Sequence, residues 1–258
     1  MSDKTSGNSL AGRVAVVTGG TRGIGFAIAE RLLAEGAQVA ICGTRQKSVD
    51  DAVSALASGV FWFVADISKP AEVKRFIAAV RERFGAIHIL VNSAGLATFR
   101  SAANLSPDEW ERMIGVNLSG VYYCCHEVLP IFIAEGGGDV INISSLAGRN
   151  AFAGGAGYNA SKSGLNAFSE AMMLDHRNDG VRVSTIMPGS VDTGFSSTPD
   201  AGTAWKIAPA DVAEVVVTLL TMPRRTTVSS VEIRPSRPAP AKHKPAPKQE
   251  RTSDDKPV

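Results

Sequence analysis

The chain has 258 residues, of which 44% are hydrophobic and 20% charged, and this composition excludes a collagen-like or mainly disordered protein. Its 27 basic and 25 acidic residues give a net charge of +2, which favours neither a nucleic acid nor a membrane surface as partner. The polar N-terminus lacks the apolar core of a signal peptide, and no segment approaches the roughly 18 consecutive apolar residues of a membrane span. We therefore expect a cytoplasmic protein with room for one large α/β domain.

Cysteine and histidine positions indicate no metal site and no disulfide framework. Cys42, Cys124 and Cys125 have no zinc-type or disulfide-type spacing, and the four histidines are scattered. The cysteines are expected to be small buried side chains.

Short apolar runs rich in valine and isoleucine alternate with longer segments of helical period. This alternation is typical of βαβ units, in which a parallel sheet is buried on both faces. It predicts a single doubly wound Rossmann domain with a seven-stranded parallel sheet flanked by helices. The expected strands are Arg13–Thr18, Gln38–Cys42, Val60–Ala65, Ile87–Asn92, Asp139–Ser144, Val181–Met187 and Val228–Ile233.

The domain is predicted to span residues 10–233, between a flexible N-terminus (1–9) and a disordered tail rich in proline, lysine and arginine (234–258). The tail contains six prolines and almost no large apolar residue. It carries seven basic and three acidic residues, a net charge of +4, which leaves residues 1–233 with 20 basic and 22 acidic residues, or −2. The tail is therefore expected to interact with polyanions only weakly and in a salt-dependent way.

A glycine-rich loop follows the first expected strand and opens the first helix, with the sequence Thr18-Gly-Gly-Thr-Arg-Gly-Ile-Gly25. Glycines let the backbone turn tightly and approach a ligand, and a helix N-terminus attracts a pyrophosphate. The spacing G-x-x-x-G-x-G is a variant of the dinucleotide fingerprint. A tight strand-to-helix turn without a ligand is the alternative.

Tyr158 and Lys162 are four residues apart in a segment of helical period, so their side chains share one helix face. A nearby ammonium group favours the phenolate and lowers the pKa of a tyrosine, which suits proton transfer. In isolation, however, such a pair is more often an ordinary surface feature.

Several further residues lie, nearly all of them, at the ends of the expected strands or at the starts of the following helices: Asp66, Asn92-Ser93-Ala94-Gly95, Asn117, Ser145 and Pro188-Gly189. Together with the glycine loop and the Tyr158/Lys162 pair, they resemble the short-chain dehydrogenase/reductase family over about residues 10–233, including members like 3-oxoacyl-[acyl-carrier-protein] reductase. The Asn-Ser-Ala-Gly segment departs from the family's usual Asn-Asn-Ala-Gly at its second residue.

The resemblance implies a catalytic set of Asn117, Ser145, Tyr158 and Lys162. Ser145 is selected over Ser144 because the family serine lies thirteen residues before the tyrosine. Tyr158 would act as acid and base at the substrate oxygen, Ser145 would hold that oxygen, and Lys162 would lower the pKa of Tyr158 and bind the nicotinamide ribose. Asn117 would support a water in the proton relay to Lys162. These roles suit an oxyanion that develops during hydride addition.

The resemblance also implies the residues that bind the cofactor. NADPH is expected over NADH, because the second strand ends in Thr44 and Arg45 with no acidic residue before Asp50, and Arg22 adds a second cation. Alternatively, Arg45 merely begins a solvated helix. The predicted cofactor-binding residues are Gly19, Thr21, Arg22, Gly23, Ile24, Gly25, Thr44, Arg45, Asp66, Ile67, Asn92, Ala94, Gly95, Tyr158, Lys162, Pro188, Gly189, Val191 and Thr193.

The implied function is an NADP-dependent oxidoreductase that reduces a ketone or aldehyde to an alcohol. A 3-oxoacyl thioester is an alternative substrate, and a non-catalytic dinucleotide-sensing protein is an alternative function; the sequence does not choose a substrate. The short segment 194–208 suggests an open site, with Phe195 and Trp205 as possible apolar contacts. Arg149 could bind an anionic substrate group, although an exposed arginine without that role is the commoner case.

Helices near residues 106–135 and 157–177 form a dimer surface in many relatives, so a homodimer or homotetramer is expected. Small residues at Gly157, Ala160, Gly164, Ala167 and Ala171 would permit close packing there. Alternatively, these small side chains only allow the helix to pack closely on the sheet of its own chain.

Overall fold

The computed structural model describes residues 9–56, 59–193 and 204–237. Seven parallel strands form one sheet in the order β3-β2-β1-β4-β5-β6-β7, which confirms the predicted doubly wound fold. The strands are β1 (Val14–Thr18), β2 (Gln38–Gly43), β3 (Phe61–Val64), β4 (Ile89–Asn92), β5 (Gly138–Ile143), β6 (Val181–Pro188) and β7 (Ser230–Ile233).

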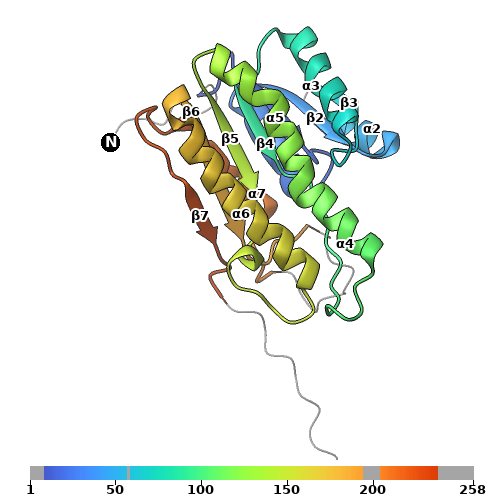
Figure 1. Cartoon of the computed structure of the whole chain (residues 1–258). Helices are drawn as coiled ribbons and strands as arrows, with labels where there is room; N and C mark the ends of the chain where they lie inside the picture. The colour runs from blue at the N-terminus through green and yellow to red at the C-terminus, as the bar shows by residue number, and fades with distance from the viewer. Residues whose placement is uncertain (1–8, 57–58, 194–203, 238–258) are drawn as a thin grey trace, which may run out of the picture.

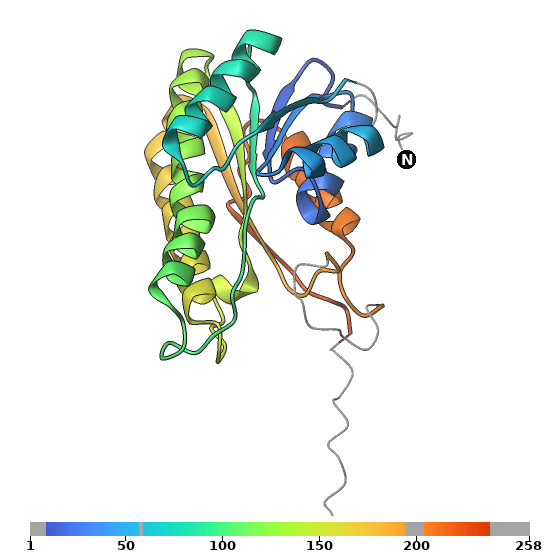
Figure 2. The same cartoon turned by 90° about the vertical axis from the view of Figure 1, so that its right-hand side faces the viewer.

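Helices cover both faces of the sheet (Figures 1 and 2). One face is covered by α1 (Gly23–Ala34), α2 (Gln46–Ala55) and α7 (Pro209–Thr221), and the other by α3 (Pro70–Phe84), α5 (Gly120–Ala134) and α6 (Ala156–His176). The short helix α4 (Pro107–Ile114) continues through a π-helical turn, Gly115–Ser119, into α5. In the described part of the chain, no helix combines the length and apolarity needed to cross a membrane.

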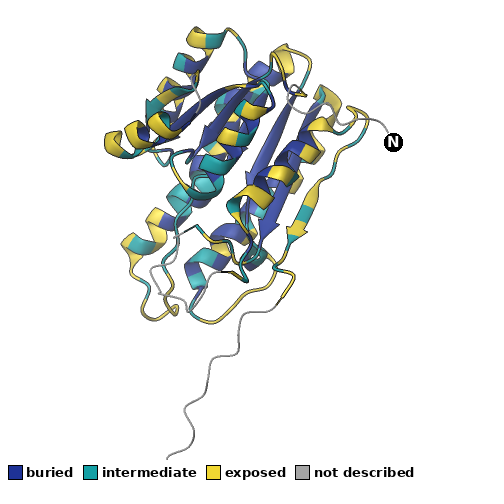
Figure 3. Cartoon of the chain, turned by 180° about the vertical axis from the view of Figure 1, so that it is seen from behind, coloured by how far each residue is buried: buried dark blue, intermediate teal, exposed yellow. Residues whose placement is uncertain are grey.

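Alternation along the strands divides the core into two layers. Val17 of β1 and Ile41 of β2 pack toward α1 and α7, whereas their neighbours Val16 and Ala40 pack toward α3, α5 and α6. Because both faces are covered, the central strands are buried at every position, as Figure 3 shows in dark blue. Strand β7 lies at the edge and is only half-buried.

The helix that leads into the π-helical turn, α4, begins with a capping box and a proline. The Ser106 hydroxyl accepts a hydrogen bond from the Glu109 amide at 3.2 Å, and the Glu109 carboxylate accepts one from the Ser106 amide at 3.0 Å. Pro107 occupies the first helical position. These caps fix where α4 starts.

A buried carboxylate holds three arginines at the N-terminal ends of the strands. Asp139, 2% exposed, lies 2.5 Å from Arg13, 2.6 Å from Arg182 and 3.2 Å from Arg224. Arg182 also donates to the carbonyls of Leu220, Met222 and Thr226. The cluster joins β1, β5, β6 and the loop after α7 at the edge of the sheet opposite the candidate site.

Candidate active site

A cavity of about 1530 Å³ lies at the C-terminal ends of the strands. The crossover in strand order between β1 and β4 falls at this edge, which is where open α/β sheets bind ligands. Residues from the loops after β1, β2, β3, β4, β5 and β6 line it.

The glycine loop after β1 approaches the loop after β4 more closely than a side chain would allow. Gly19 has φ +66, and a Cβ there would lie 2.7 Å from the Ala94 Cα. The Thr18 hydroxyl accepts hydrogen bonds from the amides of Ser93 and Ala94, both at 3.2 Å. The two loops therefore form one cradle that only glycine at position 19 permits.

The N-terminus of α1 opens onto this cradle with its amide groups uncapped. Arg22 at the N-cap makes no side-chain capping bond, and the first turn holds no acidic residue. Free amides and the positive end of the helix dipole suit a pyrophosphate, so the residues present fit a dinucleotide.

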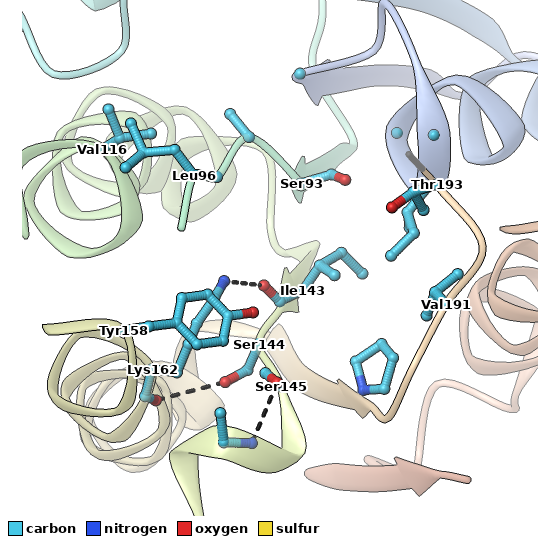
Figure 4. Close-up of a pocket in the computed structure, with 18 of the residues that line it drawn as sticks. Ser93, Leu96, Val116, Ile143, Ser144, Ser145, Tyr158, Lys162, Val191 and Thr193 are labelled. Atoms are coloured by element: carbon cyan, nitrogen blue, oxygen red, sulfur yellow. Dashed lines mark hydrogen bonds between the residues drawn. The ribbon is translucent and has the colours of Figure 1, made fainter. Parts of the chain in front are cut away.

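Tyr158 and Lys162, one turn apart on α6, extend toward the space beside Ser145 (Figure 4). The Lys162 ammonium donates to the Ile143 carbonyl at 2.9 Å, and burial lowers its pKa to about 8. Burial raises the pKa of Tyr158, whereas a hydrogen bond with Ser145 opposes that rise. Around neutral pH, Tyr158 is therefore a neutral phenol that can donate a proton.

The two adjacent serines have different surroundings. The Ser144 hydroxyl is buried, 2.5 Å from the Asn166 side-chain oxygen and 3.4 Å from the Lys162 carbonyl, and so braces β5 against α6. The Ser145 hydroxyl accepts from the Ala147 amide at 3.1 Å and pairs with Tyr158. Both serines line the cavity, but only the Ser145 hydroxyl is paired with that of Tyr158 among the described contacts.

Asn117 lies in the π-helical turn and is fully buried behind the cavity rather than lining it. Its amide accepts from the Leu96 amide at 2.9 Å, and donates to the Leu96 carbonyl at 2.9 Å and to the Ser161 hydroxyl at 3.0 Å. Asn117 thus ties the loop after β4 to α6.

Asn92, predicted to bind the cofactor, also lies behind the cavity. It is buried at the end of β4 and donates to the Asn142 side-chain oxygen at 2.8 Å. Its own side-chain oxygen has no hydrogen-bond partner among the described residues. The structure therefore places Asn92 as a link between β4 and β5 beneath the glycine cradle.

The other predicted cofactor residues come together around the cavity. Arg22 and Arg45 are exposed, and neither forms an ion pair in the described part of the chain. Besides Tyr158 and Lys162, the lining contains Gly19, Thr21, Arg22, Gly23, Ile24, Gly25, Thr44, Arg45, Asp66, Ile67, Ala94, Gly95, Pro188, Gly189, Val191 and Thr193.

The sequence reasoning missed part of the lining. Phe99 and Phe152 border the cavity, and the Phe99 ring contacts both Phe152 and Tyr158 at centroid distances of 5.7 Å. Arg234, Pro235 and Arg237, which we assigned to the tail, line it too. No sequence signal marked these positions, since isolated aromatic residues and a proline-rich segment are common elsewhere.

The three suggested substrate contacts, Phe195, Trp205 and Arg149, have different outcomes. Trp205 lines the cavity, whereas Phe195 lies outside the described residues. Arg149 does not line it but pairs with Glu232 at 3.1 Å. Of the predicted tail, residues 238–258 lie outside the described part of the chain, as do residues 1–8.

Comparison with known proteins agrees with this arrangement. The family model for short chain dehydrogenases matches residues 13–202. An uncharacterized oxidoreductase of Staphylococcus aureus is 33% identical over 88% of this chain and 98% of its own, and one from Staphylococcus saprophyticus is 34% identical with the same coverage. The chain therefore belongs to the short-chain dehydrogenase family, a family of oxidoreductases that bind a nicotinamide dinucleotide.

Solved structures share the fold over nearly their whole length. Levodione reductase has a TM-score of 0.82 and 26% identity, covering 87% of this chain and 96% of its own. An alcohol dehydrogenase from the archaeon Thermococcus sibiricus, complexed with 5-hydroxy-NADP, has a TM-score of 0.80 and 31% identity, covering 89% and 99%. A 3-ketoacyl-(acyl-carrier-protein) reductase from Brucella melitensis, complexed with NADH, has a TM-score of 0.81 and 26% identity, covering 86% and 97%.

Proposed function

We propose that this protein is an NADPH-dependent reductase that converts a ketone or aldehyde to an alcohol. The observation that carries the proposal is the hydrogen-bonded pair of Ser145 and Tyr158, beside the buried ammonium of Lys162, on the wall of a cavity that also holds the glycine cradle. All the groups that a carbonyl reduction needs from the protein are thus gathered at one place.

The bound cofactor supplies the hydride. A substrate carbonyl oxygen beside these residues can accept one hydrogen bond from the Ser145 hydroxyl and one from the Tyr158 hydroxyl. As negative charge develops on that oxygen, the proton of the Tyr158 hydroxyl transfers to it and completes the alcohol. The Lys162 ammonium, 6.0 Å from the centroid of the tyrosine ring, stabilises the resulting phenolate until solvent returns the proton.

Replacing Tyr158 with phenylalanine tests this function. The substitution keeps the ring and removes the transferable proton, so we expect kcat/KM to fall by about a hundredfold or more. The measurement is NADPH absorbance loss with a panel of ketones, aldehydes and 3-oxoacyl thioesters. Tyr122→Phe, on the exposed face of α5, is the matched control and should leave activity unchanged. Activity of Tyr158→Phe within a few fold of the native value would exclude the proposed role.

The preference for NADPH is supported by Arg22 and Arg45, which line the cavity as Thr44 does. Their loops are adjacent, since a Cβ on Gly43 would lie 2.6 Å from the Thr21 side chain. A carboxylate at this point would accept the ribose hydroxyl of NADH and repel a phosphate. We expect Arg45→Gln to weaken NADPH binding by about tenfold and to change NADH binding little. Fluorescence titration of both reduced cofactors measures this; tighter binding of NADH by the native protein would contradict it.

A further inference from the structure

The chain beyond β7 is fixed beside the reacting groups. The Gly189 amide donates to the Ile233 carbonyl at 2.8 Å, which holds the end of β7 against the loop after β6. A Cβ on Gly189 would lie 3.2 Å from both Leu146 and Pro235, so Pro235 packs close to the residue that follows Ser145. Residues 234–237 therefore border the end of the cavity where the carbonyl would react.

This end of the cavity carries an excess of positive charge. Arg234 and Arg237 line it, and both come from the segment after β7. The acidic residues in the cavity lining, Asp66 and Glu111, belong to the other end: Asp66 follows β3, and Glu111 lies one helical turn before Gly115, which faces Ser68. No acidic side chain among the lining residues balances the arginines near Ser145.

An ion pair holds Arg234 without neutralising the region. The Glu232 carboxylate bonds to Arg234 at 2.8 Å and to Arg149 at 3.1 Å, so one negative charge is shared by two guanidinium groups. Arg234 remains 56% exposed and keeps further N–H groups for a ligand. Arg237 forms no ion pair in the described part of the chain.

An apolar wall lies on the same cavity. Phe99 and Phe152 are each 45% exposed, and Phe99 packs edge-on against the ring of Tyr158. Aromatic side chains this exposed beside reacting groups suit the apolar body of a ligand.

We propose that the carbonyl substrate carries a carboxylate or phosphate group, and that Arg234 and Arg237 bind this group while the apolar body contacts Phe99 and Phe152. The proposal rests on the proposed carbonyl reductase function. Guanidinium groups bind carboxylates and phosphates through paired hydrogen bonds.

The experiment compares matched charged and neutral substrates at low ionic strength. One arm uses methyl ketones ending in a carboxylate, over a range of chain lengths, and their primary amides; the other uses the phosphate ester of a hydroxylated aryl ketone and the same ketone with its hydroxyl free. In the native protein, we expect kcat/KM of the charged member to exceed that of the neutral one by about tenfold or more in one arm. The arm that responds distinguishes a carboxylate from a phosphate.

The double variant Arg234→Gln/Arg237→Gln should lower this charged-to-neutral ratio by about tenfold. Arg225→Gln removes an exposed charge at the opposite edge of the sheet and should leave the ratio unchanged. Glu232→Gln, which releases both guanidinium groups, should raise it. A ratio near one in the native protein, or a ratio that survives the double variant, would overturn the proposal.

A measurement of ligand binding alone distinguishes failure of the anion site from failure of the proposed reductase function. Calorimetry with the full chain and NADP⁺ should show benzoate binding more tightly than benzamide, and the double variant should abolish that difference. If no ketone is reduced but this difference is present, the reductase function fails and the anion site stands. If ketones are reduced but benzoate and benzamide bind alike, the anion site fails alone.

Discussion

Lys162 combines a positive charge with near-complete burial, since it is 5% exposed. Its ammonium donates to the Ile143 carbonyl, and desolvation favours the neutral amine, so its pKa falls from the usual 10.5 to about 8. Below that pH the ammonium is charged and can stabilise a phenolate on Tyr158; above it, the amine is neutral and cannot. Because burial raises the pKa of Tyr158, the tyrosine keeps its proton over the same range.

We therefore expect kcat/KM for NADPH to fall as pH rises through about 8 in the free enzyme, since this parameter reports the ionisation of unbound protein. A pH profile from about 6.5 to about 9.5 measures this. Lys162→Arg keeps its charge throughout and should lose the decline, whatever its absolute activity. A native profile that stays flat well above pH 8 would contradict the expectation.

Among the elements, strand β5 links the arginine cluster at the N-terminal ends of the strands to the candidate site at their C-terminal ends. Asp139 near its start binds Arg13, Arg182 and Arg224, and Ser144, just beyond its end, braces Lys162 and Asn166 of α6. A buried carboxylate that loses its charge leaves its arginines without compensation. The position of the Ser145 loop thus depends on a strand that is anchored at both ends.

Asp139→Asn should consequently lower the free energy of unfolding by about 3–5 kcal/mol, measured by urea denaturation. Glu214→Gln is the matched control, because Glu214 pairs with Arg31 on the surface and is 61% exposed. An exposed pair contributes about 1 kcal/mol or less. Equal effects of the two substitutions would show that the Asp139 cluster does not stabilise the sheet.

At the scale of the whole molecule, apolar periodicity was enough to predict the seven strands, whereas the meeting of the glycine loop and Tyr158 in one site was expected from the family resemblance. Periodicity could not predict the placement of Asn117, because the π-helical turn at Gly115–Ser119 interrupts the helical period between α4 and α5. Nor could it predict Arg234 and Arg237 in the cavity, because a proline-rich composition gives no sign of packing against Gly189. Local sequence patterns determine where helices and strands form, whereas the positions of Asn117, Arg234 and Arg237 depend on contacts between residues far apart in the chain.

The small residues of α6 divide between two environments. A Cβ on Gly157 would lie 2.7 Å from Met113, and one on Gly164 would lie 2.9 Å from Leu118. These two glycines therefore leave room for side chains of the same chain, not for a second subunit. Ala160, Ala167 and Ala171 are exposed instead, and Leu174 and Tyr122 are about half exposed nearby on α6 and α5.

We expect this exposed face to form a homodimer or part of a homotetramer, since large exposed apolar groups mark interfaces. Light scattering should give at least twice the monomer mass for the native protein, and Tyr122→Glu should shift it toward the monomer. Trp62→Glu, at the exposed edge strand β3, is the control and should leave the mass unchanged. A native protein that is already monomeric would exclude the interface.

The pairing of β7 with the end of β6 has a consequence for the order in which the protein becomes functional during synthesis. The glycine cradle is complete once β4 is in place, and the Ser145, Tyr158 and Lys162 groups follow with β5 and α6, whereas β7 and Arg234 are translated after all of these. A nascent chain could thus assemble its dinucleotide half first. The arginines after β7 that we propose to bind the substrate are added later, and proteolytic removal of β7 would take them away while leaving the glycine cradle intact.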